Sequence, residues 1–197
     1  MRHLSPTWNA GGEGQFRVGI WENVDKVLET FRSLLEFDLS SIPAGSTITA
    51  ATFECWAAEF FIDASHTYIA ERIIRTDWVE MEATWNIYKT GNNWTTAGCG
   101  NNGADYSASQ SNAIVIGGTD GIGGWKSNNL LTLVSDAWDN RSKICRFRLN
   151  RNDAVGDEGY CDILSDESTE PPTAPWPYLL VTYTPPAATF TPRVMIF

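Results

Sequence analysis

Tryptophan is the residue type in this sequence that is best suited to binding another molecule. The chain has nine tryptophans, and an indole ring stacks on the C–H face of a sugar while nearby polar side chains hydrogen-bond to its hydroxyls. Trp94 and Trp125 occur in stretches rich in Gly and Asn, and Trp56 alternates to the outer side of an expected strand. We therefore predict a ligand-binding set of these three tryptophans with Arg72 and Arg75. The alternative is that most of the tryptophans pack in the core.

The sequence also contains one candidate metal site. Residues 151–158 place Asp153, Asp157 and Glu158 around a glycine, and these carboxylates would supply part of the roughly six to eight oxygen ligands that calcium takes. The spacing is not that of an EF-hand, and a solvated acidic turn explains the same residues. We expect no cofactor, with structural calcium as the alternative.

Residues that would carry out catalysis are scarce. The only two histidines are His3 and His66, and the sequence has no HExxH, GxSxG or glycine-rich phosphate-binding motif. The tightest trio of carboxylates is Asp77, Glu80 and Glu82, and a solvated turn fits it better than a glycosidase pair. We therefore expect a protein that is not an enzyme.

Alternation of apolar and polar residues predicts the strands that position these side chains. In residues 31–39 and 47–58, one set of alternate residues is mostly apolar, which is typical of half-buried strands. Further strands are expected at residues 16–21, 67–74, 113–116, 143–150, 160–164 and 178–184. Short strands at this spacing predict an all-β fold, an antiparallel β-sandwich with the connectivity of a jelly roll.

One segment has the apolar spacing of a helix, and another has the spacing of neither a helix nor a strand. Leu133, Val134 and Ala137 recur at helical spacing, and Thr132 is the expected N-cap of this short helix. Residues 90–112 are poor in large apolar side chains, so we expect a long surface loop there.

The chain divides into an expected sandwich domain at residues 1–184 and a tail at residues 185–197. The tail begins with two prolines and continues with apolar residues. Exposed apolar residues of this kind favour association with another surface. We predict that the tail mediates assembly through its apolar side chains, Phe190, Val194, Ile196 and Phe197.

The four cysteines are widely spaced and are expected to be unpaired. Cys55, Cys145 and Cys161 fall at apolar strand positions, where cysteine serves as a small buried hydrophobe. Cys99 falls in a Gly- and Asn-rich stretch, which makes it the candidate reactive thiol.

Charge and hydropathy exclude two classes of partner. The formal net charge of −10 repels nucleic acid backbones, and no apolar run reaches the ~18 residues that span a bilayer. The first residues contain no apolar run of the kind that forms a secretory signal. We therefore expect synthesis in the cytoplasm and release within a virion or another extracellular particle, with secretion as the alternative.

Residues 31–48 read FRSLLEFDLSSIPAGSTI, a string that resembles the opening of the DNRLRE (disaggregatase-related) domain. Further strings follow in the same order at residues 75–80, 83–86, 133–138 and 177–183, with Trp94 between them, so the resemblance extends over residues 8–184. Apart from Trp94, residues 90–112 lie outside these strings, and so does the tail.

This resemblance implies a jelly roll that does no chemistry itself. Members of the family are typically carbohydrate-binding modules of secreted or surface proteins, and related domains occur on virions. The first expected function is therefore a virion surface or decoration protein that binds other protein subunits, including copies of itself. The alternative is a carbohydrate-binding module that recognises a polysaccharide.

Overall fold

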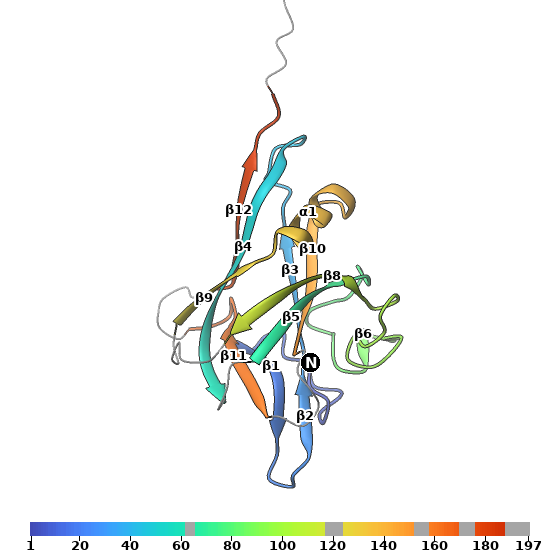
Figure 1. Cartoon of the computed structure of the whole chain (residues 1–197). Helices are drawn as coiled ribbons and strands as arrows, with labels where there is room; N and C mark the ends of the chain where they lie inside the picture. Colours follow the sequence, from blue (N-terminus) through green and yellow to red (C-terminus); the bar gives the residue numbers. More distant parts are fainter. Residues whose placement is uncertain (62–65, 117–123, 152–157, 170–175, 188–197) are drawn as a thin grey trace, which may run out of the picture.

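The computed structural model of the protein describes residues 1–61, 66–116, 124–151, 158–169 and 176–187. In these residues the chain forms two antiparallel sheets packed face to face, with a helix at one end (Figure 1). Strands β3, β4 and β5 alternate between the two sheets, as in a jelly roll. The predicted all-β sandwich with one short helix is confirmed.

The two large sheets contain ten of the twelve described strands. The first sheet has the order β12-β4-β11-β1-β2, with β9 also pairing with β4; its strands are β1 (Gln15–Glu22), β2 (Leu28–Phe31), β4 (Thr47–Phe61), β9 (Gly124–Asn129), β11 (Gly159–Leu164) and β12 (Tyr178–Thr184). The second has the order β3-β10-β5-β8; its strands are β3 (Ser33–Asp38), β5 (His66–Ile73), β8 (Tyr106–Ile116) and β10 (Ile144–Arg151). β6 (Ile87–Lys89) and β7 (Asn92–Asn93) form a separate small hairpin.

The main core lies between the sheets and is built from the predicted alternation. In β4 the inward residues Phe53 and Cys55 are fully buried, whereas Trp56 on the opposite side is only half-buried. Phe53 packs edge to face on Phe147 of β10, with ring centroids 5.6 Å apart. This contact joins the two sheets across the core.

The predicted strand at residues 31–39 is wrong in its extent. These residues are not one strand, because β2 ends at Phe31 in the first sheet and β3 begins at Ser33 in the second. Arg32 lies between the two strands, and its side chain donates hydrogen bonds to the Asn150 side chain and to the Gly98 carbonyl. It therefore fixes the place where the chain passes from the first sheet to the second.

The helix α1 (Leu131–Asn140) occurs where the periodicity predicted it and closes one end of the core with Leu133, Val134 and Ala137. Thr132 is not its N-cap. The residue at that position is Leu130, which provides no side-chain cap, and the Asn129 carboxamide oxygen instead accepts the backbone N–H of Leu131 at 2.8 Å.

Residues 90–112 are not the expected surface loop. They contain β7 and the first part of β8, and they bury Trp94, Cys99 and Asp105. Asp105 accepts backbone N–H bonds from Thr95, Thr96 and Asn101 at 2.9–3.1 Å, so a buried carboxylate organises the polar stretch. The pattern of apolar residues does not reveal this ordered stretch, because the residue at the centre of the stretch is charged.

All four cysteines are free and buried, which confirms the expected pairing state. Cys99 is not a reactive thiol, because burial raises its pKa to about 12 and removes the thiolate that reacts. In the described part of the chain, no helix has the length and apolar character needed to cross a membrane.

Candidate functional site

Three aromatic side chains from three strands meet on the outer face of the first sheet. Trp56 of β4 lies opposite Trp125 of β9, and their rings are 5.7 Å apart and nearly perpendicular. Trp125 also contacts Tyr178 of β12, with centroids 5.6 Å apart. Trp125 and Tyr178 keep 43% and 45% of their surface exposed. We call this group of three residues the aromatic platform.

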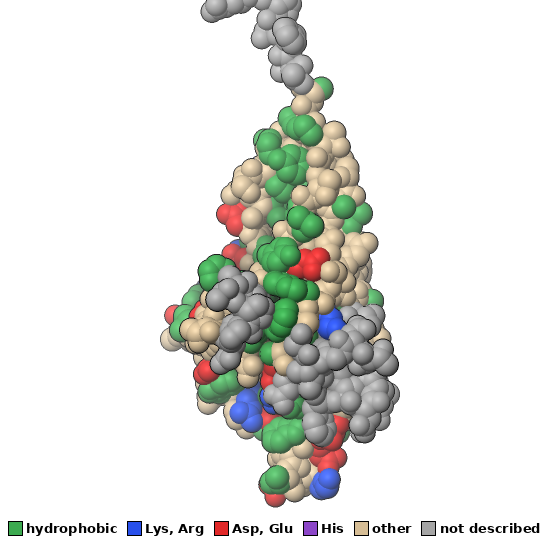
Figure 2. All heavy atoms as spheres, turned by 90° about the vertical axis from the view of Figure 1, so that its left-hand side faces the viewer, with side chains coloured by type: hydrophobic (Ala, Val, Ile, Leu, Met, Phe, Trp, Pro, Cys, Tyr) green, Lys and Arg blue, Asp and Glu red, His purple; other side chains and the backbone are tan. Residues whose placement is uncertain are grey.

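Strand register places the platform on the outside. Cys55 on β4 faces the core, so its neighbour Trp56 faces outward together with its cross-strand partner Trp125. Leu180 extends the apolar surface along β12 and is 59% exposed. Figure 2 shows this side of the molecule, where hydrophobic side chains gather in a stripe along the middle of the face.

A polar pair lies next to the platform. The Ser127 hydroxyl donates to the Glu54 carboxylate at 2.6 Å, and Glu54 lies directly opposite Tyr178 in the strand pairing. The surface therefore combines exposed ring faces with a hydroxyl and a carboxylate, which is the combination that binds sugar hydroxyls above an aromatic ring.

The structure separates the other predicted ligand-binding residues from this platform. Trp94 is only 4% exposed, and its indole N–H donates to the Thr84 carbonyl at 3.0 Å. It packs on Tyr88, over which Arg75 also lies, 4.6 Å from the ring centroid. Trp94 therefore belongs to a small second core, and Arg75 lies on the Tyr88 ring of that core. The prediction of Trp94 as an open stacking surface is corrected.

Arg72 is also occupied elsewhere. It lies on β5 beside the helix, where its guanidinium is 3.7 Å from the Asp136 carboxylate. Of the five predicted binding residues, the fold therefore brings together Trp56 and Trp125.

The predicted calcium site and the assembly tail are mostly not covered by the structure. Asp153, Asp157 and the four tail residues lie outside the described residues. Glu158 is described, and its carboxylate accepts the backbone N–H of Glu22 at 2.6 Å. Within the described residues, no group of three or more His, Cys, Asp or Glu side chains is arranged to hold a metal ion.

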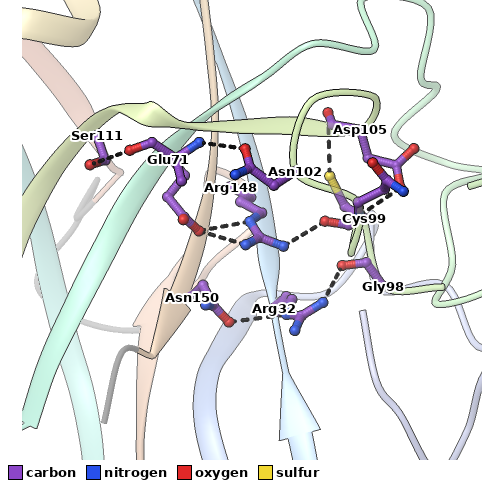
Figure 3. A network of polar contacts seen from close by, with 11 residues as sticks. Arg32, Glu71, Gly98, Cys99, Asn102, Asp105, Ser111, Arg148 and Asn150 are labelled. Atoms are coloured by element: carbon purple, nitrogen blue, oxygen red, sulfur yellow. Dashed lines mark hydrogen bonds and ion pairs between the residues drawn. The ribbon is translucent and has the colours of Figure 1, made fainter. Parts of the chain in front are cut away.

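The densest buried charge network serves the fold. Arg148 is 2% exposed, pairs with Glu71 of the neighbouring strand at 2.7 Å and donates to the Cys99 carbonyl (Figure 3). Its guanidinium also stacks on Tyr106, 3.3 Å from the ring centroid. The contacts with Cys99 and Tyr106 hold residues 98–106 against the outer face of the second sheet. Together with the Glu71 pair they bury Arg148 and leave it no access to a ligand.

The structure contains a cavity that was not predicted from the sequence. It has a volume of about 360 Å³ and lies where the N-terminal segment, the turn at residues 78–83 and the segment after β11 meet over β1 and β3. Trp78 and Trp176 line it together with several acidic residues. Its walls come from segments far apart in sequence, so no local pattern could have revealed it.

No protein-family model matches this chain, and no curated protein matches it. The resemblance to DNRLRE domains therefore stays a prediction from the sequence.

Proposed function

We propose that this protein is a non-catalytic carbohydrate-binding module whose ligand stacks on the aromatic platform. The observation that carries the proposal is the contact of Trp56, Trp125 and Tyr178 across three strands, with Trp125 and Tyr178 nearly half exposed. A rigid sheet holds the rings, so a sugar would bind them at a low entropic cost. The net charge of −10 favours a neutral or cationic polysaccharide over an acidic one.

Calorimetry against neutral cello-, manno- and xylo-oligosaccharides tests this proposal. We expect at least one of them to bind at millimolar concentration or tighter. Trp125→Ala removes the central ring and should weaken that binding about tenfold or more, which corresponds to about 1.4 kcal/mol. Tyr178→Ala should weaken it less, because Trp56 and Trp125 remain in contact.

Leu180→Ala is the matched control, because it removes exposed apolar surface from the same face without touching the ring contacts. It should leave the affinity within about twofold. The proposal fails if no oligosaccharide binds the wild type, or if Trp125→Ala and Leu180→Ala have the same effect.

A second candidate function is assembly into a virion or similar particle. The observation that favours it is β12, which ends the strand order of its sheet, exposes Leu180 and Tyr183, and leads directly to the apolar tail. An exposed edge strand can pair with a strand of another molecule.

Deletion of residues 187–197 tests the assembly function. Light scattering should show larger species for the full chain and a folded monomer for the truncated one. Assembly that persists after the deletion contradicts this role of the tail.

A further inference from the structure

The cavity beneath Trp176, here called the acidic cleft, has walls that are fixed by hydrogen bonds. The Asn9 carboxamide donates to the carbonyls of Glu80 and Ala83 at 2.6 and 2.7 Å, which ties the N-terminal segment to the turn that carries Glu80. On the opposite side, the Ser165 hydroxyl donates to the Glu13 carbonyl at 2.6 Å. These bonds hold the walls in place without a ligand, as is usual for pre-formed binding pockets.

The N-terminal wall approaches the turn so closely that it accepts no side chain at one position. A Cβ added to Gly11 would lie 2.9 Å from the carbonyl oxygen of Glu80. The glycine therefore permits the contact that shapes this side of the acidic cleft.

Aromatic rings provide stacking surfaces in the acidic cleft. Trp176 is 50% exposed, and Trp78 is half-buried. The indole N–H of Trp78 is buried and has no hydrogen-bond partner among the described residues. This nitrogen is closed off from solvent, so the acidic cleft offers a ligand the indole rings and not this donor.

Negative charge in the acidic cleft is poorly balanced. Of its lining carboxylates, Glu36 pairs with Arg146 at 2.5 Å, whereas the others have no ion pair within the described residues; these are Glu13, Glu80, Asp166 and Glu167. Partial burial raises the pKa of the Glu80 carboxyl, and the nearby charges of Glu167, Asp166 and Glu36 raise it further. Among the described residues these carboxylates do not form a group of three that could hold a metal ion. The cavity of about 360 Å³ has room for a larger organic cation.

The position of Trp176 connects this cleft to the aromatic platform. Only Pro177 separates Trp176 from Tyr178 in the sequence, and two residues of extended chain reach at most about 7 Å. A polysaccharide that extends from the platform toward Trp176 would come close to the acidic cleft. This continuity favours a sugar over a basic peptide as the bearer of the cation.

We propose that the acidic cleft binds an amino sugar with a free ammonium group, of the glucosamine type. The inference rests on the proposed carbohydrate-binding function and adds the ligand class. The pyranose ring would lie against Trp176, and the ammonium group would donate hydrogen bonds to the carboxylates of Glu80 and Glu167 and offset one of their two negative charges.

Calorimetry with the tetramer of glucosamine and the tetramer of N-acetylglucosamine tests the charge requirement. The two ligands share a backbone, and at mildly acidic pH only the first carries ammonium groups. We expect the glucosamine tetramer to bind at least tenfold more tightly, with an affinity that falls as salt is added. Equal affinity for both tetramers overturns the proposal.

Two double variants test where the ammonium group binds. Glu80→Gln with Glu167→Gln should weaken glucosamine-tetramer binding tenfold or more. Asp25→Asn with Asp139→Asn removes the same charge from exposed positions outside the acidic cleft and should change the affinity by less than twofold. Equal losses would mean attraction by the overall charge and would overturn the proposal, and thermal unfolding verifies that each variant is folded.

Two further measurements separate this inference from the proposed function. If Trp125→Ala abolishes glucosamine-tetramer binding and the Glu80/Glu167 variant retains it, the platform binds sugar and the inference about the acidic cleft is wrong. If tetralysine binds as tightly as the glucosamine tetramer, the acidic cleft recognises a basic peptide and the amino-sugar assignment is wrong.

Discussion

At the scale of single residues, the side chains that organise this protein are often polar ones in apolar-poor sequence. Asp105 is fully buried, and it accepts N–H bonds from residues on both sides of Cys99. Burial by itself raises the pKa of this carboxyl, but the bonds from Thr96, Thr95 and Asn101 together lower it below its ordinary value. The ionised form is therefore the one that the fold requires.

Asp105→Asn should destabilise the protein by about 2 kcal/mol at neutral pH, because the amide turns a donor toward backbone N–H groups. A carboxyl with a lowered folded-state pKa stabilises the fold above its unfolded pKa of about 4, and this contribution is lost as the pH falls further. The difference in the free energy of unfolding between variant and wild type should therefore become smaller in acid. Urea unfolding at several pH values measures it, and a gap that stays constant or widens in acid contradicts this account.

At the scale of elements, the outer face of the second sheet is covered by a segment that arginine hydrogen bonds and a ring contact hold on it. Arg148 and Glu71 alternate to the polar side of β10 and β5, which would be a solvated surface if the sheet were bare. Residues 98–106 cover it instead, and the Cys99 carbonyl accepts a hydrogen bond from Arg148 (Figure 3). The Tyr106 ring completes the surroundings of Arg148. The covering segment and the pair stabilise each other.

Arg148→Met should cost about 3–5 kcal/mol, because it leaves the Glu71 carboxylate buried without its partner. Combining it with Glu71→Leu should recover part of that loss, since no uncompensated charge then remains. Midpoints of urea unfolding at unchanged slope give both values. A loss below about 1 kcal/mol for the single variant would show that water reaches the carboxylate and that the segment covers it only loosely.

At the scale of the whole molecule, one core joins the two sheets while the two candidate binding surfaces lie outside it. Phe53 of the first sheet contacts both Phe37 and Phe147 of the second. The aromatic platform uses the opposite side of β4, so a binding variant there changes little of the core. This separation makes the tests of binding and of stability independent.

Phe53→Ala should lower the free energy of unfolding by about 3–5 kcal/mol through the cavity it leaves between the sheets. Because the core is shared, tryptophan fluorescence and circular dichroism should report the same unfolding midpoint. Separate midpoints would show that the sheets unfold independently and that this contact does not couple them.

Local patterning accounts for the correctly predicted part of this protein. Alternation of apolar residues predicted the sandwich, the extent of β12 and the outward direction of Trp56, since a strand assigns successive side chains to opposite faces whatever its partners are. Helical spacing likewise located α1. Wide spacing predicted that the cysteines are free, and three of the four take apolar strand positions.

Tertiary structure alone decided which side chains meet. Trp125 touches Tyr178 because β9 and β12 both pair with β4, and Trp94 is buried because the segment around it folds over the second sheet. The acidic cleft likewise brings together residues from the N-terminus, the turn after β5 and the segment after β11. Pairing of distant strands and the approach of distant segments depend on contacts that no single stretch of the sequence contains, so the face of a residue could be predicted and its neighbours could not.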